Sequence, residues 1–421
     1  MIFDHFMNKL NYFNSVIINL IVVSIIPFLI LGPFFPDLIV SISALFFLYY
    51  VFKNNKFYYI ANKPFIIFLI FCIYCLLLSL VIADNKILSF ESSLFYFRIG
   101  VFSCFIWYLI DKEKNILTYF YYSLILCFLA LLIDGYFQYF TGNNLLGIRI
   151  DGVRISSFFG KEQIMGSYLS RLFPLLFALF LVKRKYKFEI YFIGLLFILV
   201  DILIFLSGER TAFFFLNIST IFIIILIKEY QKFRLVTFII GLICILFLSA
   251  YSQSLNYRMF KGPAEDMGFV KSSKEKVIFS PAHHDHYMTA YKMFKDQPIL
   301  GHGPKTFRVL CAEKKYAVGK FSCSTHPHNF YIQLLAETGI LGFSFLLSSL
   351  IYVIYQSLKQ FKSIMFKQKR PLTDYQVCLL ASILISVWPL SPNGNFFNNW
   401  LMIVYSFPVG FYLQSVYSKK K

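Results

Sequence analysis

Charged residues are scarce in this chain. Asp, Glu, Lys and Arg make up 14% of its 421 residues, whereas soluble globular proteins carry about 25%. Hydrophobic residues make up 58%, and the mean hydropathy is +0.66. A soluble fold of this composition would have to expose much of its apolar surface to water. The scarcity of charge therefore excludes a soluble protein and indicates an integral membrane protein with several spans.

Acidic residues are fewer than basic ones, so the formal net charge is +19. On a soluble domain this excess would indicate a nucleic-acid partner. Here the Lys and Arg residues fall largely in short segments between long apolar runs, where they act as topology signals. We therefore expect membrane lipids, and no nucleic acid, as partners.

Twelve apolar stretches are long enough to span a membrane, which takes about 20 residues per helix. Their length favours helices over strands, because only helices and closed barrels satisfy the backbone in lipid, and barrel strands alternate polar with apolar residues. The sequence predicts an all-α integral membrane protein with about twelve transmembrane helices. The predicted spans are 15–31, 36–52, 64–82, 92–110, 116–140, 166–182, 190–206, 212–227, 235–251, 328–358, 375–391 and 398–416.

The distribution of Lys and Arg over alternate loops predicts the orientation. With a cytoplasmic N-terminus, 21 of them fall on the cytoplasmic side and five in the short loops opposite. Such asymmetry places both termini in the cytoplasm. The 21 are Lys9, Lys53, Lys56, Lys63, Lys112, Lys114, Lys183, Arg184, Lys185, Lys187, Lys228, Lys232, Arg234, Lys359, Lys362, Lys367, Lys369, Arg370 and Lys419–Lys421.

Residues 252–327 form one long polar stretch of 76 residues, which this topology places outside the cytoplasmic membrane. Loops of this length are usually functional or disordered. Punctuating prolines and glycines and an amphipathic run over 287–294 favour a small folded cap with short helices. The predicted organisation is helices one to nine in 1–251, a periplasmic loop in 252–327 and helices ten to twelve in 328–421.

Cysteines divide along the same line. Six lie in apolar runs, and only Cys311 and Cys323 lie in the outer loop. In an oxidising periplasm this pair is expected to form a disulfide, worth roughly 3 kcal/mol in the chain-entropy model. Two free thiols are the alternative. A structural zinc site is not expected, because no CxxC spacing is present.

Ionisable residues within predicted spans are costly and often mark function. Arg98, Asp134, Arg171 and Asp201 are of this kind. The two aspartates have an equally simple interpretation as structural partners of the two arginines inside the bundle, and we favour it.

Two outer segments carry cations beside glycines. Arg210 ends the short SGER turn at 207–210, and Arg149, Arg154 and Lys161 lie in the loop 147–166. Guanidinium groups suit bidentate phosphate recognition, and glycine lets backbone N–H groups approach an anion. The alternative is pairing with ordinary lipid phosphates.

Residues 324–342, STHPHNFYIQLLAETGILG, join the outer loop to the tenth helix. They place His326 and His328 at the membrane surface, with His328 at the expected helix start. The positive end of the helix dipole lowers the proton affinity of an imidazole there, and a neutral imidazole suits a general base. Gly339 and Gly342 are expected to allow close helix packing.

Four motifs occur in order along the chain. One is His328-Asn329, nine residues, Gly339, two residues and Gly342, and the others are RISSFFG at 154–160, SGER at 207–210 and QPILGHGP at 297–304. In these motifs, and in its expected twelve helices with one large outer loop, the chain resembles the O-antigen ligases and O-antigen polymerases. These are membrane glycosyltransferases that use glycans linked to undecaprenyl diphosphate.

This resemblance implies a site on the periplasmic face of the bacterial inner membrane. His328 would act as general base on an acceptor sugar hydroxyl, which displaces undecaprenyl diphosphate with inversion. The acceptor would be lipid A-core or a growing glycan. No metal or other cofactor is expected, because arginines would neutralise the diphosphate. The residues implied for diphosphate binding are Arg154, Arg210, Arg258, Lys305 and Arg308, and the supporting residues are His326 and Asn329.

The chain departs from the family where many members carry an arginine shortly before the 297–304 motif. Here residues 283–287 read HHDHY, so Arg258, Lys305 and Arg308 are the candidate substitutes. The histidine run has two other interpretations, a divalent metal site or a solvated loop.

Three alternatives for the function stay open. A polytopic protein with buried charges is often a transporter, and a flippase of the lipid-linked glycan would share the basic outer loops. Within the family, the form of the His-Asn motif favours a ligase over a polymerase.

Overall fold

The structure is a computed structural model that describes residues 17–184, 186–269 and 279–418. Across these ranges the chain is helical and forms no β-strand, only isolated bridges between Asn143 and Arg149 and between Asp151 and Arg154. The predicted all-α class is confirmed. Lys9, Lys185 and Lys419–Lys421, which entered the prediction of orientation, lie outside the described residues.

Each of the twelve predicted spans coincides with helical structure, although the exact number of crossings stays a prediction. Residues 17–31 are helical with a turn at Ser24, and the span predicted over 92–110 belongs to a longer kinked unit, Lys86–Lys112. The helices are α2 (Ile25–Leu31), α3 (Phe34–Lys53), α4 (Lys63–Val81), α5 (Lys86–Ser93), α6 (Phe97–Lys112), α7 (Ile116–Thr141), α8 (Met165–Lys183), α9 (Glu189–Leu206), α10 (Arg210–Leu226), α11 (Gln231–Tyr251), α16 (Phe330–Met365), α17 (Asp374–Ser386) and α18 (Asn399–Tyr417).

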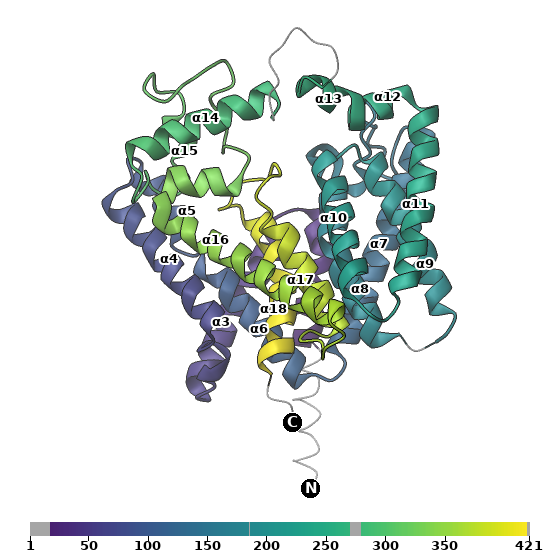
Figure 1. Cartoon of the computed structure of the whole chain (residues 1–421). Helices are drawn as coiled ribbons and strands as arrows, with labels where there is room; N and C mark the ends of the chain where they lie inside the picture. The colour runs from purple at the N-terminus through teal and green to yellow at the C-terminus, as the bar shows by residue number, and fades with distance from the viewer. Residues whose placement is uncertain (1–16, 185, 270–278, 419–421) are drawn as a thin grey trace.

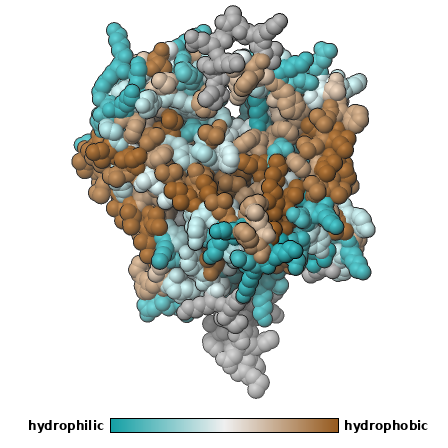
Figure 2. All heavy atoms as spheres, viewed as in Figure 1, coloured by the Kyte–Doolittle hydropathy of each residue, from teal (hydrophilic) through white to brown (hydrophobic). Residues whose placement is uncertain are grey.

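By length and composition, eight helices in the described part of the chain can cross a membrane. They are Phe34–Lys53, Lys63–Val81, Lys86–Lys112, Ile116–Thr141, Met165–Lys183, Glu189–Leu206, Gln231–Tyr251 and Phe330–Met365. Figure 2 shows hydrophobic residues as a band across the middle of the molecule, with hydrophilic residues at both ends. Large side chains such as Leu246 and Phe247 are exposed. Exposed apolar surface of this extent fits a lipid environment.

The described part of the long polar stretch contains short helices at one end of the bundle: α12 (Gln253–Asn256), a π-helical turn (Tyr257–Lys261), α13 (Gly262–Asp266), α14 (Pro281–Asp296) and α15 (Phe307–Leu310). In Figure 1 they lie above the membrane helices, with α12 and α13 over α10 and α11, and α14 and α15 over α5 and α16. The amphipathic run over 287–294 is part of α14, as predicted. We call residues 252–327 the cap.

Charges inside the bundle are paired, but not as expected. Asp201 accepts two hydrogen bonds from Arg234 at 3.0 and 3.1 Å, and Arg98 pairs with Asp37. Arg171 donates to the Tyr405 hydroxyl at 3.0 Å. The structural interpretation of Asp201 is therefore correct, whereas the expected pairing with Arg98 or Arg171 is wrong. The sequence did not predict these pairs, because the two members of each pair lie far apart along the chain.

Asp134 of α7 also has a partner other than an arginine. It accepts hydrogen bonds from the Leu145 N–H at 2.7 Å and the Ser157 hydroxyl at 2.5 Å. Gln138, one turn later, accepts from the N–H groups of Ser156 and Ser157. These contacts fix the loop that carries Arg154 onto α7.

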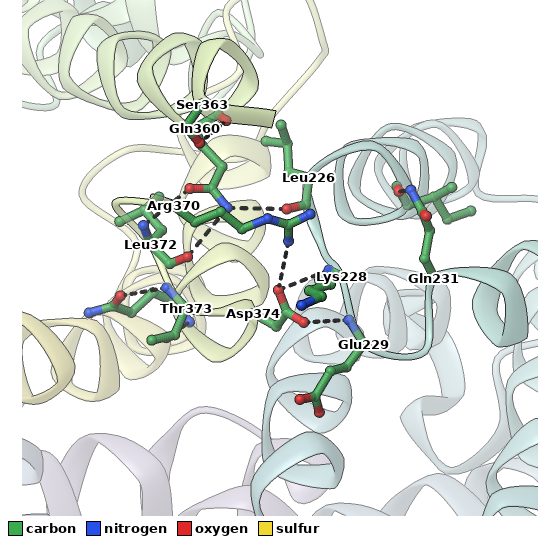
Figure 3. Close-up of polar contacts among 12 residues, drawn as sticks. Leu226, Lys228, Glu229, Gln231, Gln360, Ser363, Arg370, Leu372, Thr373 and Asp374 are labelled. Atoms are coloured by element: carbon green, nitrogen blue, oxygen red, sulfur yellow. Dashed lines mark hydrogen bonds and ion pairs between the residues drawn. The ribbon is translucent and has the colours of Figure 1, made fainter. Parts of the chain in front are cut away.

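At the end opposite the cap, the loops after α10 and α16 are tied together (Figure 3). Asp374 accepts hydrogen bonds from the N–H groups of Lys228 at 3.0 Å and Glu229 at 2.6 Å, and also contacts Arg370. Buried Gln360 donates to the Leu226 carbonyl oxygen at 3.2 Å. These contacts fix the far ends of two helices whose opposite ends carry Arg210 and the His328–Asn329 pair.

Candidate active site

His328 lies two residues before Phe330, the first residue of α16, with Asn329 between them. Asn329 caps this helix, and its side-chain oxygen accepts from the N–H groups of Tyr331 at 2.9 Å and Ile332 at 3.2 Å. The backbone of His328 has a φ of +58°, and its carbonyl oxygen accepts from the Asn393 N–H at 2.8 Å. The backbone at His328 is thus held from two sides, by the helix cap and by the α17–α18 loop.

Three other imidazoles surround the His328 ring. Ring centroids lie 4.2 Å away for His326, 5.3 Å for His286 and 5.6 Å for His283. His283 and His286 are one turn apart on α14, so they share a helix face. We call these four residues the histidine cluster. The sequence had offered His283 and His286 as a metal run or a solvated loop, and their i, i+3 spacing was the signal that could have placed them on one helix face.

Burial dominates the acid–base state of this cluster. It lowers the pKa of His328 to about 3, with further lowering by His326, His283 and His286. Burial also lowers the pKa of His326 to about 4, and it lowers the pKa of His283 and His286. The helix dipole was the expected cause, but desolvation is the main one. All four rings are neutral at pH 7.

The His328 ring is available for chemistry. Among the described residues, neither of its nitrogens takes part in a hydrogen bond, whereas the Nδ1 atoms of His326 and His283 contact the hydroxyls of Thr325 and Ser280. A neutral imidazole always keeps one nitrogen with a lone pair. His328 is therefore able to take a proton from a group placed beside it.

Three arginines from separate segments meet around Gly208. Arg258 Nε donates to the Gly208 carbonyl oxygen at 3.2 Å, and Arg210 Nε donates to the Arg258 carbonyl oxygen at 2.8 Å. Gly208 has a φ of +65°, and a Cβ there would lie 3.1 Å from Arg154 Cγ and 3.5 Å from Arg258 Nε. We call Arg154, Arg210 and Arg258 the arginine cluster. Only glycine combines this backbone with such close approach.

Mutual repulsion is visible in the arginine cluster. Burial lowers the pKa of Arg154, Glu209 opposes this, and Arg258 lowers the pKa further. Burial is also the main cause of the lowered pKa of Arg210, followed by Arg258. Arg154 Nε is buried and has no hydrogen-bond partner in the described part of the chain. The cluster therefore holds positive charge that an anion would stabilise.

Glu209 fastens the SGER turn to α8. Its carboxylate accepts from the N–H groups of Gly166 at 2.6 Å and Ser167 at 3.0 Å, and from the Ser167 hydroxyl at 2.6 Å. A carboxylate at a helix N-terminus is favoured by the helix dipole. Arg154 donates to the carbonyl oxygen of Gln163 at 3.0 Å, two residues before the start of α8. By holding the start of α8, Glu209 therefore also stabilises the loop that carries Arg154.

The two clusters are neighbours. After burial and His286, the charge of Arg210 lowers the pKa of His283. On the other side, Arg308 lowers the pKa of His326, although burial is again the larger cause. Arg210 and Arg308 are thus each close enough to act electrostatically on one ring of the histidine cluster. Lys305 is placed differently, because the charges around it are those of Arg308, Glu337 and Glu91.

The 297–304 motif and Gly339 contact each other. The Ile340 N–H donates to the Pro298 carbonyl oxygen at 2.9 Å, and the Gly303 N–H donates to the Glu337 carbonyl oxygen at 2.7 Å. Gly339 has a φ of +61° and kinks α16, and a Cβ there would strike the Ile299 carbonyl. Close packing does occur at Gly339, but against this extended segment of the cap. The expectation that its partner is a helix is therefore wrong.

Two further features concern the cap. Cys311 and Cys323 are joined by a disulfide. Metal-binding geometry is not seen within the described ranges, where no group of three or more His, Cys, Asp and Glu side chains is arranged to hold an ion.

A family model described as O-antigen ligase matches residues 192–347. This segment belongs to the O-antigen ligase superfamily. No curated protein matches the chain. The resemblance inferred from the four motifs is confirmed, and the match supports an O-antigen ligase-type or polymerase-type function.

The O-antigen ligase segment runs from α9 into α16. It contains Arg210, Arg258 and the whole histidine cluster, whereas Arg154 lies outside it. Arg154 nevertheless packs against Gly208 within the segment. The candidate site therefore joins the matched segment to the loop before α8.

Proposed function

We propose that this protein transfers a glycan from undecaprenyl diphosphate to a sugar hydroxyl at the periplasmic face of the bacterial inner membrane, as an O-antigen ligase. The acceptor in this proposal is lipid A-core. The superfamily match supports a transferase of lipid-linked glycans in general. The donor, the acceptor and the inverting course are our inferences from the site.

The arginine cluster is the observation that carries the proposal. Arg154 and Arg258 lie against Gly208, Arg210 donates to the Arg258 carbonyl oxygen, and the repulsion among the three charges is only partly offset by Glu209. Guanidiniums bind phosphate oxygens in bidentate geometry. A diphosphate held there would gain from all three, and the gain grows as negative charge develops on the leaving group.

His328 supplies the base in this scheme. The acceptor hydroxyl gives its proton to the free nitrogen of His328, and its oxygen attacks the anomeric carbon of the donor sugar. The bond from that carbon to the diphosphate oxygen breaks, and its electron pair leaves with undecaprenyl diphosphate. Attack opposite the leaving group inverts the configuration.

The low pKa of His328 is compatible with this role. It keeps the ring unprotonated in the site without donor. An anion nearby favours the protonated form of an imidazole, so diphosphate bound at the arginine cluster would raise the proton affinity of His328 at the moment of attack. Asn329 would position His328, His326 would support it, and Arg308 and Lys305 would add positive charge on the cap side.

Deletion of the gene followed by gel analysis of lipopolysaccharide tests the proposal. A ligase predicts lipid A-core without polymer and an accumulation of undecaprenyl-linked polymer, whereas core carrying a single repeat unit would indicate a polymerase. Lipid-linked glycan retained at the cytoplasmic face would indicate a flippase. Complementation with Arg210→Ala should reproduce the deletion, and Lys261→Ala, an exposed cation of the adjacent π-helical turn, should restore the wild-type pattern.

A further inference from the structure

A second site lies at the opposite end of α14 from the histidine cluster. It is an open cavity of about 480 Å³, within the range of small-molecule sites. Its walls come from the turn between α4 and α5, the C-terminal end of α14 and the segment around α15. The lining residues are Asp84, Asn85, Asp296, Gln297, His302, Val309, Leu310, Glu313, Lys315 and Tyr316. We call it the acidic cavity.

Backbone geometry fixes His302 in the wall of this cavity. The residue lies between Gly301 and Gly303, whose φ values are +68° and +97°. A Cβ at Gly301 would lie 2.5 Å from the Thr338 nitrogen, and one at Gly303 would lie 2.5 Å from Ala83 Cβ. The two glycines thus clamp the segment between α16 and the α4–α5 turn, and His302 is only 2% exposed.

The hydrogen bonds of His302 leave one ring nitrogen free. Nε2 lies 3.0 Å from the Met293 carbonyl oxygen, which can only accept, so Nε2 carries the proton. Nδ1 faces Asp84 Oδ2 at 4.0 Å, too far for a direct hydrogen bond, and has no other hydrogen-bond partner among the described residues. The gap between the ring nitrogen and the carboxylate leaves room for a bridging group. A hydroxyl group both donates and accepts, which suits this position.

The charges of the cavity select against anions. Asp84, Asp296 and Glu313 outnumber Lys315, and Lys315 is already paired with Asp296 at 2.5 Å. Asp296 also accepts from the Tyr316 hydroxyl at 2.6 Å. These commitments leave Asp296 poorly suited to a metal ion, and none of the described His, Cys, Asp or Glu residues form a metal-binding group here. The remaining acceptors and amides favour an uncharged or amino-bearing polyol.

We propose that the acidic cavity binds a saccharide unit of the glycan, at a distance from the sugar that reacts. Asp296 follows His286 by ten residues of α14, which is roughly 15 Å along the helix, the span of a short oligosaccharide. The disulfide from Cys311 holds the adjacent wall. This inference rests on the proposed function and assigns to the same protein a specificity for neutral or amino sugars.

Binding to the full-length protein in lipid nanodiscs tests the cavity directly. The probes are the lipid-free polymer released by mild acid from the cells' undecaprenyl-linked glycan, and the core oligosaccharide released from their lipid A. Saturation-transfer difference NMR titrations would give the Kd of each, so the two arms distinguish a donor subsite from an acceptor subsite. The variants are Asp84→Ala with Glu313→Ala, and Lys295→Ala, an exposed α14 residue outside the cavity lining, as control.

We expect one of the two glycans to bind, and the double variant to weaken that binding at least about tenfold, because two carboxylates that accept hydrogen bonds from its hydroxyl groups are lost. Lys295→Ala should bind as the wild type does. Absence of binding to the wild type, or equal binding to the double variant, would overturn the subsite. His328→Ala separates the two claims, because glycan binding should persist in it, and normal transfer by this variant would count against the proposed function alone.

Discussion

The two ends of α14 differ in charge although they belong to one helix. Near its start, His283 and His286 face His328 beside Arg210, and at its end Asp296 faces His302, Asp84 and Glu313. The first region suits a phosphate and a base, and the second suits hydroxyl groups. A lipid-linked glycan has the same polarity, with an anionic diphosphate at one end and sugars at the other. The difference between the two ends of α14 indicates the direction along the cap in which such a donor, or a glycan acceptor, would lie.

Both regions depend on glycines at positive φ. Gly208 admits Arg154 and Arg258 to the arginine cluster, and Gly301 with Gly303 sets His302 into the acidic cavity. The glycines thus place other side chains and take no part in chemistry. Motifs that combine glycine with ionisable residues, such as SGER and GHG, therefore encode backbone shape as well as charge.

Among the variants that compare the two ends of α14, the largest effect should follow from removing a charge at the cationic end. Arg210→Ala is expected to lower the rate of transfer by about 10²–10³, the usual cost of losing one fixed donor to a developing charge. Arg210→Lys should recover only part of this loss, because an ammonium lacks the bidentate geometry. Rates with purified protein and undecaprenyl-linked donor provide the measurement.

The same assay distinguishes the roles of the two ends of α14. Variants of the acidic cavity should raise KM for long glycans and leave kcat nearly unchanged, because they touch no reacting atom. An equal loss of kcat in Arg210→Ala and in the double variant Asp84→Ala with Glu313→Ala would remove the distinction between the two ends.

A smaller and purely structural effect is expected at the kink of α16. Gly339→Ala should destabilise the protein by more than Gly152→Ala, although the two φ values are +61° and +59°. Both variants carry the backbone penalty of about 1–2 kcal/mol, but only at Gly339 does the new Cβ strike another segment, since nothing lies within 4 Å at Gly152. Thermal midpoints in detergent would test this, and equal midpoints would refute the clamp between the cap and α16.

The smallest effect concerns pH. All four rings of the histidine cluster have a pKa below the ordinary 6.5 in the folded protein, so the unfolded chain binds more protons below that pH. Their contribution to stability is thus present above about pH 6.5 and declines as the pH falls toward 4.

Thermal midpoints at pH 7.5 and 4.5 measure this decline. The drop should be smaller for His326→Gln with His328→Gln, since glutamine does not titrate. The same drop in this variant and in the wild type would show that the histidine cluster does not govern the acid sensitivity of the protein.

Much of the fold could be predicted because a membrane helix is recognised from the apolar composition of one continuous stretch of sequence. Each of the predicted spans coincides with helical structure, and the amphipathic run over 287–294 lies in α14. The superfamily followed from short motifs that carry their own spacing. The kink at Gly339 was not expected, because its cause is a contact with residues 298–300 of the cap.

Contacts between distant segments could not be predicted from the sequence for the same reason. Asp201 was expected to pair with Arg98 or Arg171, but its partner is Arg234 of α11. No motif predicted the hydrogen bond from the Asn393 N–H to the His328 carbonyl oxygen. His283 and His286 were considered as metal ligands, although they face His328. Tertiary packing decides such pairings, and no single-sequence periodicity records them.

The role of His328 as general base is tested best by His328→Ala, because this variant separates donor binding from chemistry. With purified protein, the Kd for the undecaprenyl-linked donor and the single-turnover rate of transfer would both be measured, with the exposed His284→Ala as control. We expect a rate lower by about 10²–10⁴, the usual effect of losing a general base, with donor affinity retained. Transfer at the wild-type rate, or a parallel loss of donor affinity and rate, would contradict it.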